Sequence, residues 1–320
     1  MPPDTTYYPG ETGPPPPTQE YRDSLEQAYY RQKAITKNES YTGLASFFFV
    51  VILGIVAMGI YRRIPYFANN IRRRNPVKNL AALVASAGIQ YHDWLKQHNP
   101  YYNTLSPLLQ RRFLQRTIVF MQSKEFRFHS MQEEEYIKVL VSGAAVQVTF
   151  GLQNYLLDFF PVIHVIRKEY ILDIDNEMYD GHVSRTGIYI SWNHFTEGFE
   201  DYTDCRNVGL HEMAHAVAYD VFLGQEDHDD WKFKQRLQEF REDGIPIFRA
   251  MREKCNPLLD SYGATNFDEF WAVCVETFFE NPADFATAMP DLYASLVELL
   301  NQDPVKPAII VNETVAGIVN

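Results

Sequence analysis

The stretch LHEMAHAV, from Leu210 to Val217, places two histidines four residues apart, with a glutamate directly after the first. On an α-helix, residues four apart share one face, so His211 and His215 could ligate one metal ion together. Glu212 lies one step round the helix, where it could reach a water on that metal without ligating it. Two ligands and a general base in this order are typical of zinc hydrolases with an HExxH motif.

The residues around the motif are apolar or small on almost every side of a helix predicted at 204–222. We therefore expect this helix to be buried, with Asp204 as its N-cap. Buried histidines and glutamates need partners, and a metal ion would supply one. Solvated histidines on a helix surface are the alternative, which this apolar context disfavours. The flanking residues are Val208, Leu210, Met213, Ala214, Ala216, Val217 and Ala218.

A catalytic zinc usually has three protein ligands and one open position, so the motif leaves one ligand to be found. The extended pattern HExxHxxGxxH is absent, because Ala218 and Val221 occupy its last two defined positions. The later segment YGATNFDEFWAVCVETFFENP, residues 262–282, places carboxylates in an otherwise apolar predicted helix. A carboxylate there is the natural third ligand, and the candidates are Asp268, Glu269 and Glu276.

Two segments in order, GLHEMAHAV and SYGATNFDEFWAVCVETFFENP followed by PDLY, resemble the Mlc titration factor A (MtfA) family of zinc-dependent peptidases. The resemblance covers about residues 100–303 and is best from residue 204 onward. It implies one Zn²⁺ per chain and a gluzincin-type ligand set, with Glu212 as the general base. The implied metal ligands are His211, His215 and Glu269.

The site of this family is similar to that of the anthrax lethal factor catalytic domain, where a tyrosine seven residues before the ligating glutamate stabilises the transition state. Tyr262 stands seven residues before Glu269, so the resemblance gives it the role of oxyanion donor. Glu276 is expected to contact a ligating histidine, and Asn207 matches the family pattern N-x-x-x-HExAH. The chain departs from the family at Ala218, where an aspartate is usual.

Hydrophobic periodicity predicts helices, then strands, then helices again, with no alternation of strand and helix. The predicted fold class is α+β, a zincin-like metallopeptidase domain in which a mostly helical wrapper surrounds a small sheet. The expected helices lie near 79–97, 104–123, 133–158, 204–222, 229–253, 267–280 and 290–301. The expected strands lie at 162–166, 169–174 and 186–192.

An uncharged run, SYTGLASFFFVVILGIVAMGIY, extends from Ser40 to Tyr61. As a helix it would be about 33 Å long, which matches the hydrocarbon core of a bilayer and predicts a transmembrane helix. More arginines and lysines follow the run than precede it. The positive-inside rule then places the catalytic domain in the cytoplasm, tethered to an inner or plasma membrane by a single pass. Three cysteines without a CxxC pair agree with a reducing compartment.

Composition divides the chain into five expected segments. Residues 1–80 hold ten Lys and Arg against six Asp and Glu, a net +4, which leaves −16 for residues 81–320. Residues 81–320 are thus strongly acidic, which argues against nucleic acid as a partner because nucleic-acid binding needs a cationic surface. The segments are a Pro-rich, disordered N-terminal part at 1–39, the transmembrane helix at 40–61, a basic juxtamembrane linker at 62–78, the zinc peptidase domain at 79–303 and a C-terminal tail at 304–320.

The sequence therefore predicts a membrane-tethered zinc metallopeptidase that acts on a peptide or protein substrate. The alternative is a membrane-anchored regulatory module that binds a protein partner, such as a transcriptional regulator, with little or no proteolysis. A third interpretation, a scaffold with a structural zinc, requires a Cys or His as a fourth ligand. Cys274, five residues after Glu269, faces away from it on a helix, which disfavours that interpretation.

Overall fold

The computed structural model describes Gln27, Arg31 and residues 80–171, 178–223 and 230–306. The chain divides into two units, Met1–Phe67 and Ala68–Asn320, and the elements below belong to the second. The expected transmembrane segment at 40–61 and the linker at 62–78 lie outside the described residues. Within the described ranges, no helix combines the length and the apolarity needed to cross a bilayer.

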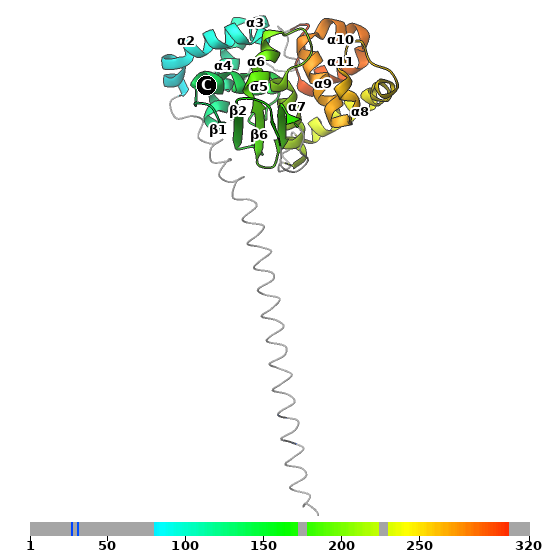
Figure 1. Cartoon of the computed structure of the whole chain (residues 1–320), viewed down its shortest axis with the longest axis horizontal. Helices are drawn as coiled ribbons and strands as arrows, with labels where there is room; N and C mark the ends of the chain where they lie inside the picture. Colours follow the sequence, from blue (N-terminus) through cyan, green and yellow to red (C-terminus); the bar gives the residue numbers. More distant parts are fainter. Residues whose placement is uncertain (1–26, 28–30, 32–79, 172–177, 224–229, 307–320) are drawn as a thin grey trace, which may run out of the picture. The chain divides into compact units, whose positions relative to one another are not determined.

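Helices make up most of the second unit (Figure 1). The helices that precede or interrupt the sheet are α2 (Leu80–His98), α3 (Pro100–Thr104), α4 (Pro107–Ser123) and α5 (Glu135–Thr149). The helices that follow it are α6 (Trp192–Glu200), α7 (Val208–Leu223), α8 (Asp230–Glu253), the 3₁₀ turn η1 (Ser261–Ala264), α9 (Phe267–Glu280), α10 (Pro282–Ala288) and α11 (Pro290–Leu300). Side-chain caps from Asn99 and Ser106, each followed by proline, explain where α3 and α4 begin.

A four-stranded mixed sheet has the strand order β1-β2-β6-β5. Its strands are β1 (Glu125–His129), β2 (Val162–Ile166), β6 (Gly187–Ser191) and β5 (Gly181–Ser184). The first three are parallel, and β5 runs antiparallel to β6 at the edge. A separate two-stranded ladder joins β3 (Tyr170–Ile171) to β4 (Met178–Tyr179). The residues from the sheet that enter the core are Ile163, Val165, Ile188 and Ile190.

The strand β1, the helix α5 and the strand β2 form a parallel crossover unit, so the expectation that strands and helices do not alternate was wrong. Parallel neighbours need a long connection, and α5 supplies it. The sequence EFRFH of β1 mixes charged and aromatic residues, because its side chains alternate between exposed and half-buried positions at the sheet edge. Pairing with β2, which is distant in sequence, decides its conformation.

The helix α5 ends at Thr149 and not near residue 158. Arg116 of α4 donates hydrogen bonds to the carbonyls of Thr149, Phe150 and Leu152, at 3.4, 2.7 and 2.9 Å. These bonds cap the C-terminal end of α5 and hold the chain in the turns that follow it. Apolar periodicity continues past Thr149 because the turn residues Leu157 and Phe160 are themselves buried in the core.

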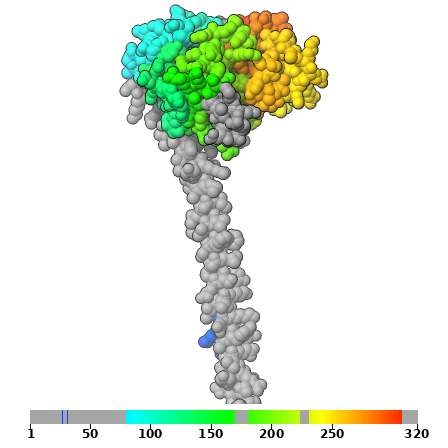
Figure 2. Space-filling model, in the orientation of Figure 1, coloured from blue at the N-terminus to red at the C-terminus, as the bar shows by residue number. Residues whose placement is uncertain are grey.

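The core lies where α7 packs on α9, on α5 and on the strands β5 and β6. Most of α9 is buried, including Phe270 and Phe278. The indole nitrogen of Trp271 in α9 donates to the carbonyl of Ala214 in α7 at 2.9 Å, which fixes one helix against the other. On the face in Figure 2, the early helices (cyan) and the late helices (orange) lie on opposite sides of the green central segment. A mostly helical unit with a small mixed sheet is confirmed.

Candidate metal centre

The helix that carries the HExxH motif begins at Val208, later than the sequence suggests. The side-chain oxygen of Asn207 accepts a hydrogen bond from the backbone N–H of Leu210 at 3.1 Å, which is the contact an N-cap makes. Asp204 instead accepts from the backbone N–H of Arg206 at 3.0 Å and closes the turn before the helix. The predicted cap at Asp204 was therefore wrong, and Asn207 takes its place.

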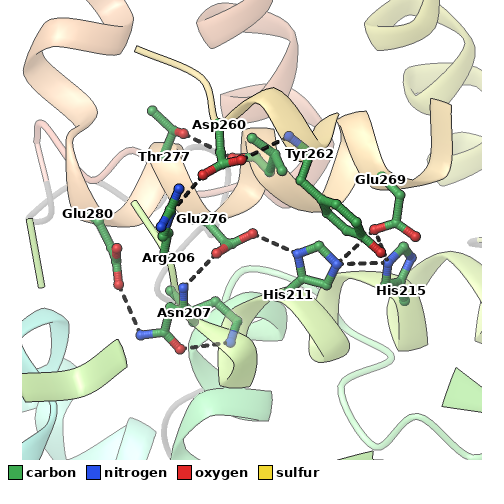
Figure 3. Close-up of polar contacts among 12 residues, drawn as sticks. Arg206, Asn207, His211, His215, Asp260, Tyr262, Glu269, Glu276, Thr277 and Glu280 are labelled. Atoms are coloured by element: carbon green, nitrogen blue, oxygen red, sulfur yellow. Dashed lines mark hydrogen bonds and ion pairs between the residues drawn. The ribbon is translucent and has the colours of Figure 1, made fainter. Parts of the chain in front are cut away.

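Two buried carboxylates from α9 hold Asn207 in this position (Figure 3). Its backbone N–H donates to Glu276 Oε2 at 2.6 Å, and its side-chain amide donates to Glu280 Oε1 at 2.9 Å. The same amide donates to the carbonyl of Gly198 at 3.0 Å. Burial, reinforced by the charge of Glu276, raises the pKa of Glu280 to about 9 although the Asn207 hydrogen bond opposes the shift. The start of α7 is thus tied to the end of α9.

Three side chains from two helices converge on one point (Figure 3). His211 Nε2 lies 2.9 Å from Glu269 Oε2 and 3.1 Å from His215 Nε2, and His215 Nε2 lies 3.3 Å from Glu269 Oε2. These side chains are only 12–17% exposed. Tetrahedral ligand atoms at about 2.1 Å from a zinc ion stand about 3.4 Å apart, so the observed separations approach those of a zinc site.

The second nitrogen of His211 determines which way its lone pair faces. Its Nδ1 lies 2.6 Å from Glu276 Oε1, and because a carboxylate only accepts, we assign the ring proton to Nδ1. The Nε2 lone pair then points toward His215 and Glu269. Converging lone pairs repel one another unless a cation or a proton lies between them. The chemistry of this donor set therefore fits a divalent metal ion.

The carboxyl group of Glu269 is strongly acidic in this arrangement. Burial works to raise its pKa, but hydrogen bonds and charge from His211 and His215 outweigh burial and lower the pKa to about 2. The ionised form, which a metal ligand must have, is therefore favoured. Asp268, another candidate for the third ligand, is exposed in the first turn of α9 and lies outside the cluster.

Glu212 is buried beside the cluster, with 5% of its surface exposed. Its Oε2 has no hydrogen-bond partner among the residues that the structure describes. Burial raises the pKa of this carboxyl to about 7, although the charges of His211 and His215 oppose the shift. A carboxylate with a pKa near neutrality can both accept and return a proton at physiological pH.

Tyr262 stands at the open side of the cluster, with 54% of its surface exposed. Its ring centroid lies 5.9 Å from that of His211, and Figure 3 shows the phenol reaching toward the three converging side chains. Asp260 caps η1 by accepting from the backbone N–H of Tyr262 at 2.8 Å. Its other oxygen accepts from Arg206 Nε at 2.7 Å, which ties this turn to the segment before α7.

The structure brings the predicted residues His211, Glu212, His215, Tyr262 and Glu269 to one place, with Glu276 and Asn207 behind His211. Sequence reasoning missed Glu280, although it follows Glu276 by four residues in an apolar helix and so shares its face. Three histidines without ligand spacing lie in the sheet, outside the cluster. His129 stacks on His164, and His164 and His182 each stack on Tyr189 of the neighbouring strand β6.

Two histidines from one helix, a glutamate from another and a buried glutamate beside them are the side chains of a metal-dependent hydrolase. The chain belongs to the family described as glucose-regulated metallo-peptidase M90, whose model matches residues 70–300 and so spans both helices of the centre. This match confirms the family that the two sequence motifs suggest, and it indicates a metallopeptidase. Such a family implies a metal ion, usually zinc.

One relative carries no functional description of its own. The chain is similar to an uncharacterized protein of Synechocystis sp. (strain ATCC 27184 / PCC 6803 / Kazusa), with 24% identity over 221 residues. The similarity covers 62% of this chain and 78% of that protein.

Proposed function

We propose that this protein is a zinc-dependent peptidase in which His211, His215 and Glu269 hold one metal ion. The observation that carries this proposal is the convergence of two imidazole nitrogens and one carboxylate oxygen within 3.3 Å of one another. When bound, zinc acts as a Lewis acid toward the carbonyl of the scissile bond and lowers the pKa of a water molecule.

Glu212 supplies the general base. It takes a proton from the attacking water and returns that proton to the amine that leaves. Its burial and its pKa of about 7 support both steps, because the carboxyl changes protonation state at little cost near neutral pH. Glu276 keeps the proton of His211 on Nδ1, so that Nε2 remains free to ligate.

Tyr262 supplies the oxyanion donor. Its phenol lies at the exposed side of the centre, from which a peptide can approach, and it donates a hydrogen bond to the oxygen that becomes negative during attack. The cap from Asp260 and the Asp260–Arg206 ion pair position the turn that carries this ring. Together with the peptidase family, these groups support a peptide or protein substrate, because the carbonyl of a peptide bond needs both polarisation and an oxyanion donor.

Substitution of Glu212 by glutamine tests this function. Glu212→Gln keeps the size of the side chain but cannot take a proton, so kcat/KM on fluorogenic peptides should fall by at least about 100-fold. Metal analysis should still find one zinc per chain. The matched control is Asp268→Asn, which neutralises an exposed carboxylate of α9 outside the cluster and should leave hydrolysis unchanged. A wild-type rate in Glu212→Gln would contradict the proposed mechanism.

A further inference from the structure

The first residue of the edge strand β5 packs directly on the carboxylate of Glu212. A Cβ atom added to Gly181 would lie 2.6 Å from both Cγ and Oε1 of Glu212, and 2.7 Å from Cδ. Real Cβ atoms essentially never come within 3.0 Å of a heavy atom in a residue that is not a chain neighbour. Only glycine therefore leaves room for the side chain of Glu212 where it stands.

Backbone conformation does not explain this glycine. Gly187, at the start of β6, adopts a φ of 152°, which side chains rarely tolerate, whereas Gly181 has no positive φ and lies in regular antiparallel pairing. At Gly181 the three atoms nearest to an added Cβ all belong to Glu212, so the requirement comes from the close approach of this side chain. The contact thus concerns the position of one side chain and not the shape of the strand.

The strand side of the contact is fixed. Gly181 pairs with Ile190 of β6, and the residue before it, Asp180, accepts a backbone hydrogen bond from Ser191 at 2.8 Å. At the other end of β5, Ser184 pairs with Gly187 across the hairpin. Because β5 is held at both ends, added bulk at position 181 would displace the side chain of Glu212 before it displaced the strand.

We propose that Gly181 is a positioning residue: its bare Cα forms the wall that sets where the carboxylate of Glu212 stands beside the three converging side chains. This inference rests on the proposed role of Glu212 as general base. A base must lie within hydrogen-bond reach of the proton it takes, and Glu212 has little free space in which to find another productive position. The edge strand therefore contributes to the site through the backbone of Gly181, a residue without a side chain, which limits where the Glu212 carboxylate can lie.

The first experiment measures hydrolysis by the full-length protein. In Gly181→Ala, kcat should fall by about 10- to 100-fold, because a displacement of about 1 Å costs that much, while KM changes less than about twofold. Zinc content should stay at one per chain, since no ligand moves. The matched control is His182→Ala, a change in the same strand at a ring that stacks on Tyr189, and it should keep kcat. A wild-type kcat in Gly181→Ala would overturn the proposal.

The second experiment needs no hydrolysis and separates the contact from general damage to the strand. Gly181→Ala should lower the Tm of the wild-type protein by several degrees but leave the Tm of Glu212→Ala unchanged, because truncation of Glu212 vacates the space that the new methyl group needs. Equal losses of Tm in both backgrounds would overturn this proposal while leaving the peptidase function intact. A different outcome is that Gly181→Ala lowers the Tm only when Glu212 is present, while Glu212→Gln hydrolyses peptides at the wild-type rate. That outcome would refute Glu212 as the base and, with it, the proposed role of Gly181.

Discussion

Glu276 joins the candidate metal ligands to the frame of the molecule, because each of its oxygens has a different donor. Oε1 accepts from His211 Nδ1, and Oε2 accepts from the backbone N–H of Asn207. Both donors need an acceptor, and a glutamine side chain offers only one. Glu276→Gln would therefore place an N–H group against one of these donors.

We expect Glu276→Gln to weaken zinc binding by about 10- to 100-fold, as is usual when the partner of a ligating histidine is lost. Either the glutamine turns its amide toward His211 and moves the ring proton to Nε2, or it disturbs the start of α7 at Asn207. Competition with a chromophoric chelator would measure the zinc Kd. Asp268→Asn is again the control, and an unchanged Kd in Glu276→Gln would show that this carboxylate does not support the ligand.

Removal of the phenol hydroxyl at Tyr262 should affect the chemical step and not the metal. We expect Tyr262→Phe to lower kcat by about 100-fold, the usual loss when one oxyanion donor is removed, with KM and zinc content nearly unchanged. Tyr219→Phe removes the hydroxyl of another exposed tyrosine, on α7, and should leave kcat unchanged. A large rise in KM alone would assign Tyr262 to substrate binding instead.

At the residue scale, spacing along the sequence predicts which residues share one face of a helix. It does not predict contacts between separate elements. His211 and His215 follow from their separation, and the apolar neighbours of Glu269 and Glu276 mark them as buried carboxylates. Gly181 gives no such signal, because its role depends on the approach of β5 to α7. Contacts between elements that are distant in sequence decide residues of this kind.

At the element scale, Glu280 ties the end of α9 to the cap of α7 while carrying a buried carboxyl group. Burial raises its pKa to about 9, well above the usual 4.5, so the folded protein retains a proton that the unfolded chain loses. The stability from this group is fully present below pH 4.5 and is lost as the pH rises toward 9, at about 1.4 kcal/mol per pH unit.

Glu280→Gln should remove this pH dependence. The amide oxygen can still accept from Asn207, and the side chain no longer ionises. With both proteins metal-free, the variant should be more stable than the wild type at about pH 8, and the difference should shrink toward about pH 5. Urea unfolding at several pH values would measure both free energies. A constant difference across this range would mean that Glu280 does not titrate as its burial suggests.

Two of the helices that follow the sheet, α8 and α9, were predicted closely because their apolar positions recur at the helical period, whereas the short helices α6 and α10 were not predicted. Expectations near 229–253 and 267–280 match α8 and α9 within a residue. The strand expected at 186–192 ends at Ser191, because Trp192 begins α6, where its ring stacks on Phe195 at 5.3 Å. The strand β1 was missed, since five residues of mixed polarity become a strand only through pairing with β2.

At the scale of the whole molecule, the site depends on segments that only the tertiary fold brings together. The HExxH helix comes from one part of the sequence, the proposed third ligand from a later helix, and Gly181, which packs on Glu212, from an edge strand that precedes both. The transmembrane helix at 40–61 and the cytoplasmic location of the domain that follows it remain predictions from hydropathy and flanking charge. The residues of this helix lie outside the described part of the chain.

A metal ion held by His211, His215 and Glu269 would cross-link α7 to α9, so it should stabilise the entire folded unit. A ligand that binds only the folded state at about 100 times its Kd adds about 2.7 kcal/mol, which corresponds to a Tm rise of about 5–10 °C for a domain of this size. We therefore expect a chelator to lower the Tm of the full-length protein by that amount and added zinc to restore it. Glu269→Ala lacks the ligand that α9 supplies, so its Tm should change much less with either reagent. If neither the chelator nor added zinc changes the Tm of the wild-type protein, and metal analysis finds no zinc, then the converging side chains hold no structural or catalytic ion.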